Sequence, residues 1–96
     1  MKDLNKLTKN YNMHNYYKNK NILITGGAGF IGSELSSQLA NNCKKLVIVD
    51  NLVNGKLENI KKLLCDSVSF QKVDIRDAEK MSSLMDGIDV FFHLAC

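Results

Sequence analysis

The stretch Thr25-Gly26-Gly27-Ala28-Gly29-Phe30-Ile31-Gly32 decides the fold that we predict for this chain of 96 residues. It follows a short apolar run at 22–24, typical of a strand buried on both faces. It precedes a segment in which Ile31, Leu35 and Leu39 recur every four residues, which predicts a helix with one apolar stripe. Its glycines have the Gly-x-Gly-x-x-Gly spacing of a dinucleotide-binding turn. That spacing alone is a weak signal, and the flanking strand and helix make it specific. A glycine turn without a ligand is the alternative.

Glycine suits this turn for chemical reasons. The missing side chains permit a tight turn and let a pyrophosphate approach the backbone, and Gly32 allows the helix to pack closely against the strand. Backbone N–H groups at the start of the helix then face the phosphates at the positive end of the helix dipole. The cofactor-binding residues predicted from the turn are Gly26, Gly27, Gly29, Phe30, Ile31 and Gly32.

Asp50 closes the next apolar run, at 46–49, and lies 18 residues beyond Gly32. A carboxylate at this place accepts hydrogen bonds from the ribose hydroxyls of adenosine, and its negative charge repels a 2′-phosphate. The sequence therefore favours NAD over NADP as the cofactor. The alternative is that Asp50 merely caps a turn.

The rest of the chain continues the alternation of strands and helices. Apolar residues indicate strands at 46–49, 68–73 and 90–94, a helix at 57–64, and a further helix that Asp77 can cap and that ends before Gly87. Four strands and three helices predict an α/β fold of the Rossmann type, a doubly wound parallel sheet. The expected strand order is 3-2-1-4, and the sheet is expected to be incomplete, with only the first four strands of such a fold.

Composition and charge narrow the class of protein. Hydrophobic residues make up 45% and charged residues 24%, which is typical of a globular domain. Residues 1–20 hold five lysines and one aspartate, so a total charge of +3 leaves −1 for residues 21–96. We interpret 1–20 as a polar, basic N-terminal extension and 21–96 as the N-terminal part of a dinucleotide-binding domain. No basic stripe for a nucleic-acid partner is visible in 21–96.

Neither a membrane partner nor a metal site is indicated. No apolar stretch approaches the roughly 18 to 20 residues that span a bilayer, so we expect a cytoplasmic protein. Cys43, Cys65 and Cys96 are widely spaced and form no Cys-x-x-Cys pair, which predicts reduced thiols without a disulfide framework. A chain of this length is short for an enzyme that holds both a dinucleotide and a substrate, so we expect it to be part of a longer protein.

Four segments, taken together, resemble the extended branch of the short-chain dehydrogenase/reductase family. The turn at 25–32 has the form typical of that branch, and 50–55 resembles the Asp-Asn-Leu-x-Asn-Gly loop of its nucleotide-sugar epimerases. The pair at 74–75 is similar to the family's reader of the adenine edge, and 93–95 to its His-Leu-Ala segment beside the cofactor. The resemblance covers 21–96 and implies NAD contacts from Asn51, Asn54, Gly55, Asp74, Ile75, Leu94 and Ala95.

The resemblance also implies a function. Nucleotide-sugar epimerases and dehydratases of this family transfer a hydride between the sugar and tightly bound NAD, and we expect the whole protein to do so as a homodimer. The family's catalysts are a Ser or Thr and a Tyr-x-x-x-Lys pair on a helix after the fifth strand. Tyr16-x-x-x-Lys20 matches only as a string, because it precedes the first strand.

We therefore expect no catalytic residue within this chain and little or no turnover by the 96 residues alone. The resemblance implies that the chain is an N-terminal fragment of such an enzyme, and that the catalysts lie beyond Cys96. Two alternatives stay open: another extended-family enzyme, such as a ketone reductase, and a non-catalytic module that senses NAD.

Overall fold

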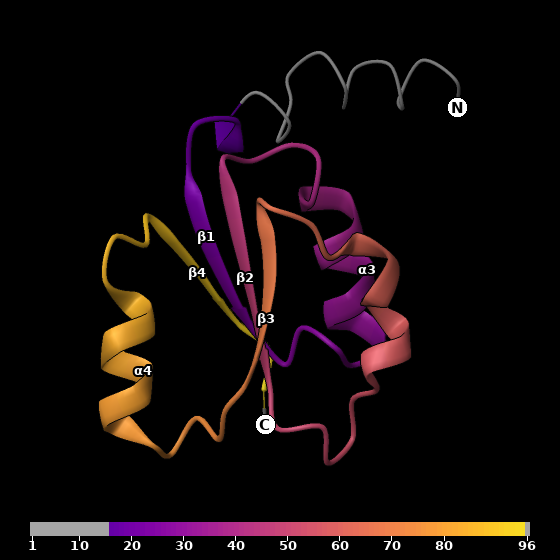
Figure 1. Ribbon diagram of the computed structural model, residues 1–96, viewed down its shortest axis with the longest axis vertical. Helices are drawn as coiled ribbons and strands as arrows, with labels where there is room; N and C mark the ends of the chain where they lie inside the picture. The colour runs from indigo at the N-terminus through magenta and orange to yellow at the C-terminus, as the bar shows by residue number, and fades with distance from the viewer. Residues whose placement is uncertain (1–15, 96) are drawn as a thin grey trace.

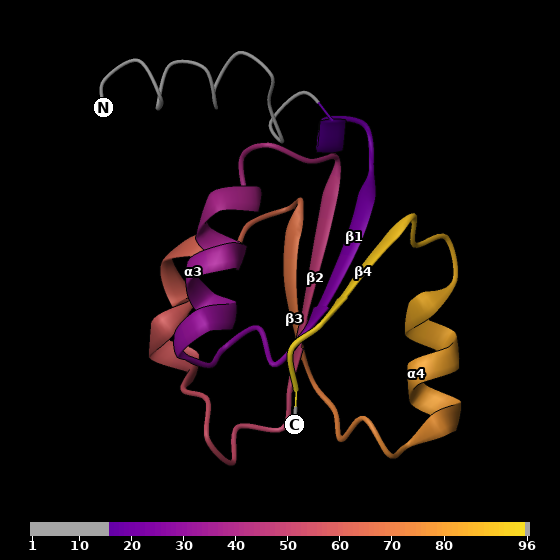
Figure 2. The same ribbon diagram turned by 180° about the vertical axis from the view of Figure 1, so that it is seen from behind.

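The structure, a computed structural model, describes residues 16–95. Its parallel sheet has α-helices on both faces (Figure 1). Seen from the front or from behind, α3 and α4 lie on opposite faces of the sheet (Figure 2). In chain order the elements are β1 (Asn21–Thr25), α3 (Phe30–Leu39), β2 (Lys45–Asp50), the 3-10 helices η1 (Leu57–Asn59) and η2 (Lys61–Leu63), β3 (Val68–Lys72), α4 (Ala78–Met85) and β4 (Val90–His93).

The strand order β3-β2-β1-β4, with every pair parallel, confirms the predicted fold class and strand order. β1 is central, and its Leu23 lies level with Val47 of β2 and Phe91 of β4. Because parallel strands all run in one direction, their carboxyl ends meet at the same edge of the sheet. The residues that follow each strand are therefore brought together at that edge.

Apolar residues of the central strands are buried on both faces, as the continuous apolar runs predict. In β1, Ile22 and Ile24 belong to the core on the side of α3, and Leu23 belongs to the core on the side of α4. The second core is the less covered one, since no residue of α4 is fully buried. The predicted cap of α4 is present, because Asp77 Oδ1 accepts the Lys80 backbone N–H at 3.2 Å.

The predicted helix at 57–64 is wrong. The segment forms two 3-10 turns that meet at Ile60, whose φ of −123° and ψ of −3° lie outside the helical region. Leu57, Ile60 and Leu63 recur every three residues, a spacing that suits the 3-10 period as well as the α-helical one. Among these three side chains, only Ile60 is completely buried.

The buried face of α3 differs from the apolar stripe expected in the sequence. Ile31 is 72% exposed, whereas Gly32, Ser36 and Leu39 are buried. The small residues let the helix come close to the glycine turn, and Ser36 Oγ donates to the Gly27 carbonyl at 3.4 Å. Close approach at small side chains therefore decides which face of α3 is buried. Within residues 16–95, no helix is long and apolar enough to cross a membrane.

Candidate functional site: a pocket at the carboxyl edge of the sheet

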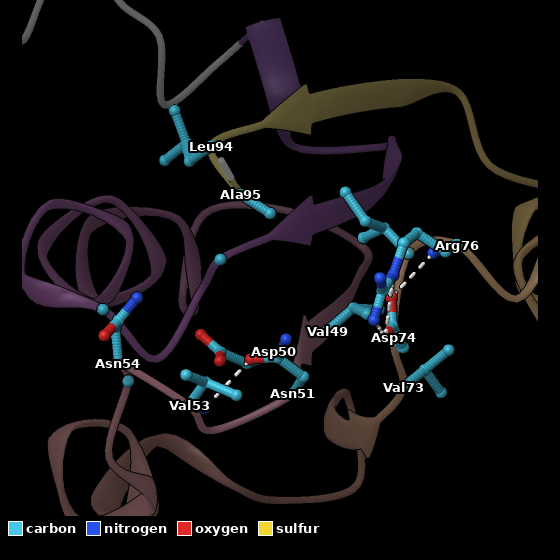
Figure 3. A pocket seen from close by; sticks show the side chains of 14 residues that line it. Val49, Asp50, Asn51, Val53, Asn54, Val73, Asp74, Arg76, Leu94 and Ala95 are labelled. Carbon is cyan, nitrogen blue, oxygen red and sulfur yellow. Dashed lines mark hydrogen bonds and ion pairs between the residues drawn. The ribbon is translucent and has the colours of Figure 1, made fainter.

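A pocket of about 470 Å³ opens at the carboxyl edge of the sheet (Figure 3). Its walls are the glycine turn after β1 and the chain at 49–55, 73–76 and 94–95, where β2, β3 and β4 end. Open parallel α/β sheets bind their ligands at this edge. The predicted cofactor-binding residues that line the pocket are Gly26, Gly29, Asp50, Asn51, Asn54, Gly55, Asp74, Ile75, Leu94 and Ala95.

The glycine turn presents bare backbone to this pocket. Gly26 has a φ of +72°, and a Cβ on it would lie 2.8 Å from the Ala95 nitrogen. A Cβ on Gly32 would collide with the Gly26 carbonyl oxygen. A Cβ on Gly29, by contrast, would meet only that same oxygen, at 3.3 Å, so Gly29 faces open space. Packing therefore requires glycine at positions 26 and 32, whereas Gly29 leaves room for a ligand.

Ala28 holds the turn to the chain that follows β2. Its N–H donates to Asp50 Oδ2 at 3.0 Å. Its carbonyl accepts the Lys56 N–H at 3.0 Å and Asn59 Nδ2 at 2.9 Å. The segment that was expected to be a helix therefore supports the glycine turn through the Asn59 side chain.

The first turn of α3 has backbone N–H groups at 30–32 without an acceptor among residues 16–95. The first helical bond runs from Ser33 N–H to the Gly29 carbonyl, and no side chain caps the helix. Such N–H groups attract an anion because the helix dipole is positive there. Phe30 and Ile31 are 93% and 72% exposed and their side chains do not line the pocket, so only their backbone is available to a ligand there.

Asp50 is 7% exposed at the end of β2. Besides Ala28, its carboxylate accepts the Leu52 N–H on Oδ1 at 2.8 Å, and Leu52 has a left-handed φ of 64°. A Cβ on Gly55 would lie 2.6 Å from Oδ2, so glycine makes room for the carboxylate. Each oxygen keeps a second lone pair. Asp50 therefore supports a loop and can still accept hydrogen bonds from a ligand.

Asp74, Ile75 and Arg76 form the wall after β3. Arg76 donates to Asp74 Oδ1 from its backbone N–H at 2.9 Å and from Nε at 3.1 Å, and to Oδ2 from Nη2 at 2.7 Å. These hydrogen bonds hold the pKa of Asp74 at about 2, below its usual range. The Ile75 N–H has no hydrogen-bond acceptor among residues 16–95. The wall thus presents an ionised acceptor next to a backbone donor.

The segment after β4 closes the pocket beside β1. The Leu94 N–H donates to the Thr25 carbonyl at 3.0 Å, and Thr25 Oγ1 lies 2.7 Å from His93 Nδ1. Leu94 and Ala95 line the pocket and His93 does not. His93 is thus placed to hold the end of β4 rather than to touch a ligand.

The pocket includes four residues that the sequence prediction missed: Val49, Val53, Val73 and Arg76. Val49 and Val73 each precede a predicted carboxylate, so their places at the ends of apolar runs were a usable signal. Arg76 follows Asp74 by two residues, a spacing at which backbone and side chain can reach an aspartate carboxylate. Val53 has no signal beyond its place in the loop.

Four predicted residues lie outside the pocket lining: Gly27, Phe30, Ile31 and Gly32. Gly27 packs against β2 instead, because a Cβ on it would lie 2.5 Å from Ile48 Cγ2. Gly27 and Gly32 are thus buried supports of the turn. Phe30 and Ile31 are exposed in the first turn of α3.

Tyr16 and Lys20 precede β1 and lie at the amino edge of the sheet, opposite the pocket. Lys20 Nζ lies 5.4 Å from the centroid of the Tyr16 ring, and Tyr16 is 64% exposed. This pair is a surface cation–π contact. In the part of the chain that the structure describes, no group of three or more His, Cys, Asp or Glu side chains is arranged to hold a metal ion.

Comparison with known proteins places the chain in a family. Residues 22–96 match the NAD dependent epimerase/dehydratase family, and the chain belongs to it. It is 41% identical over 76 residues to a UDP-N-acetyl-alpha-D-glucosaminuronate decarboxylase of Bacillus cytotoxicus, a match that covers 79% of this chain and 23% of the relative.

Solved structures agree with this assignment. A UDP-N-acetylglucosamine 4-epimerase from Methanobrevibacter ruminantium M1, in complex with UDP-N-acetylmuramic acid, superposes with a TM-score of 0.74 at 38% identity, over 82% of this chain and 25% of that one. The enzyme WbmF of Bordetella bronchiseptica, in complex with NAD+ and UDP, has a TM-score of 0.73 at 34% identity, over 83% and 24%. The chain thus spans about a quarter of the length of these proteins.

Proposed function

We propose that this chain binds NAD in the pocket at the carboxyl edge of the sheet, as the cofactor-binding part of a nucleotide-sugar epimerase or dehydratase. The observation that carries the proposal is the Asp50 carboxylate, which lies against the glycine turn with a lone pair available on each oxygen. Two adenosine ribose hydroxyls can donate to these lone pairs. A 2′-phosphate at the same place would meet a buried negative charge, so NADP is disfavoured.

The other residues fit the remaining parts of the dinucleotide. Bare backbone at Gly26 and Gly29 and the first N–H groups of α3 suit the pyrophosphate. The acceptor of Asp74 and the Ile75 N–H suit the adenine edge, which has an amino donor next to a ring-nitrogen acceptor. A volume of about 470 Å³ is within the usual range of ligand pockets. Contacts along the cofactor are assigned to Asn51, Asn54, Gly55, Leu94 and Ala95.

Bound NAD supplies a reversible acceptor of hydride. The residues of this chain bind and orient it, and none in 21–96 is a tyrosine that could serve in a Tyr-x-x-x-Lys pair. We assign hydride transfer with a nucleotide sugar to the whole protein. Support comes from the relatives. Two of them are named for UDP sugars, and the solved structures contain UDP-N-acetylmuramic acid in one case and NAD+ with UDP in the other.

Titration of NAD and NADP into the purified 96-residue protein tests the cofactor proposal. We expect weak NAD binding, NADP binding at least about tenfold weaker, and little turnover. Asp50→Asn, which removes the charge, should narrow the difference between the cofactors, whereas Asp66→Asn, an exposed aspartate away from the pocket, should not. A clear preference of the wild type for NADP would contradict the proposal.

The coding sequence tests the substrate proposal. Downstream of Cys96 it should continue into a helix with Tyr-x-x-x-Lys, and the protein that carries this helix should convert a UDP sugar with its NAD retained. A stop codon directly after Cys96 would count against an enzyme of this kind.

We also propose a domain boundary, an oligomeric state and a location. Residues 21–96 form the N-terminal part of the NAD-binding domain, 1–20 a basic extension, and the whole protein a cytoplasmic homodimer. The start of β1 at Asn21, the free thiols of Cys43 and Cys65, and the family resemblance support these points. Deletion should stop before Tyr17, because its ring packs on Phe92 with centroids 5.9 Å apart. Removal of 1–15 should leave NAD affinity unchanged. Sedimentation of the whole protein checks the homodimer, and cell fractionation checks the location.

A further inference from the structure

The Arg76 side chain folds back along Asp74 in the wall of the pocket (Figure 3). It is 86% exposed, so packing does not force it into this position. Nη2 lies 2.7 Å from Oδ2, and Nε lies 3.1 Å from Oδ1 and 3.2 Å from Oδ2. With the backbone N–H at 2.9 Å from Oδ1, three donors of one residue act on one carboxylate.

The number of lone pairs decides what Asp74 can still do. A carboxylate offers about four acceptor positions, and the three N–H groups of Arg76 take up all but about one of them. Because the guanidinium fork binds both oxygens, the carboxylate also loses its freedom to rotate. Asp74 therefore presents one oriented acceptor next to the Ile75 N–H.

We propose that Arg76 is a positioning residue for nucleobase recognition: it orients the Asp74 carboxylate so that a single acceptor faces the 6-amino group of an adenine base, beside the Ile75 N–H. This proposal rests on the proposed binding of NAD. Arg76 itself need not touch the base. It acts by removing in advance the rotational freedom that Asp74 would otherwise lose on binding.

A consequence for base selectivity follows. A 6-oxo base such as hypoxanthine has an oxygen acceptor where adenine has its amino donor, and a ring N–H where adenine has an acceptor. Both groups are mismatched against Asp74 and Ile75. Arg76 should therefore favour the 6-amino base and contribute nothing to binding of the 6-oxo base.

The test measures dissociation constants of the 96-residue protein for NAD and for its 6-oxo analogue, nicotinamide hypoxanthine dinucleotide. Arg76→Ala should weaken NAD binding about three- to fivefold, as suits an exposed pair, and change analogue binding by less than about twofold. Arg76→Lys, which retains the charge but not the fork, should recover part of the loss. Lys80→Ala removes an exposed cation outside the pocket and should behave as the wild type.

Two results would overturn the proposal. An equal loss of both dinucleotides in Arg76→Ala would mean that the guanidinium acts only as a charge on the phosphates. Tighter NAD binding in that variant would mean that Arg76 competes with the base for Asp74.

A titration of the Asp74 carboxyl by NMR without cofactor separates this proposal from the proposed function. The wild-type carboxyl should titrate near pH 2, and in Arg76→Ala it should move toward the ordinary value of about 3.9. If the pKa of Asp74 rises as expected in Arg76→Ala but the wild type binds no NAD, the proposed function is wrong, and so is the role of Arg76 in nucleobase recognition. If NAD binds in preference to NADP but Arg76→Ala changes neither the titration nor the affinity, the role of Arg76 alone is overturned.

Discussion

The two carboxylates of the pocket, Asp50 and Asp74, follow neighbouring strands and are held in opposite ways. Asp50 is 7% exposed and accepts backbone N–H groups from two different loops, at Ala28 and Leu52. Asp74 has a side chain that is 39% exposed, and it is held by Arg76, two positions along the chain. One carboxylate belongs to the packed framework, and the other is part of a local surface arrangement.

Residues at corresponding positions after two strands can therefore have different structural roles. Removal of a buried acceptor leaves buried donors unpaired, which is costly. Removal of an exposed acceptor lets water take its place. We therefore expect changes near Asp50 to affect folding and binding together, and changes at Asp74 to affect mainly binding.

The largest effect is expected from Gly32→Ala, which breaks the framework on the Asp50 side. The new Cβ would collide with the Gly26 carbonyl oxygen, so α3 and the turn must separate. We expect a loss of about 3 kcal/mol in the free energy of unfolding, measured in urea, and no detectable NAD binding. Gly87→Ala is the control: its φ of +77° adds strain, but a Cβ there meets nothing within 4 Å and the site is outside the pocket. Wild-type NAD affinity in Gly32→Ala would contradict this expectation.

Asp50→Ala should have the next largest effect. It leaves the Ala28 and Leu52 N–H groups without their acceptor, and the left-handed Leu52 without its support. We expect a loss of about 2 kcal/mol in the free energy of unfolding and a loss of NAD binding of at least about tenfold. Asp66→Ala should change neither. A variant that lost NAD binding at unchanged stability would show that Asp50 serves the ligand alone.

Asp74→Asn should change selectivity and change stability only slightly. The amide can donate where the carboxylate only accepts, so preference should move from NAD toward its 6-oxo analogue. We expect the midpoint of urea unfolding to fall only slightly, because the side chain is open to water. A marked fall in that midpoint would mean that Asp74, like Asp50, supports the fold.

The smallest effect concerns pH. The folded pKa of Asp74, about 2, lies below its unfolded value of about 3.9, so the ionised pair stabilises the fold above about pH 4. That contribution is lost as the pH falls through about 2. The wild type should therefore exceed Asp74→Asn slightly in unfolding midpoint at pH 6, and the difference should shrink as the pH falls toward 2 and vanish below it. A difference that grew on acidification would contradict the ion pair.

Particular residues show what could be predicted. The glycine spacing, the apolar runs and the cap at Asp77 depend on neighbours close in sequence, and each predicted element near them is present apart from the helix at 57–64. That helix failed because a three-residue spacing suits two helix types. The exposure of Ile31 could not be read from the sequence, because close approach at Gly32 and Ser36 sets the buried face of α3.

For Asp50 and Asp74 too, one part could be predicted from the sequence and another part only from the tertiary structure. The sequence by itself determined the parallel sheet and the places of Asp50 and Asp74 after their strands, because these follow from local patterns of apolar residues and glycines. The resemblance of four short segments indicated the family, which the comparison with known proteins shows. Only the tertiary structure decided that Asp50 supports the glycine turn while Asp74 depends on Arg76. The physical reason is that hydrogen-bond partners and burial depend on which chain segments meet at the edge of the sheet, and strand pairing brings those segments together from distant parts of the sequence.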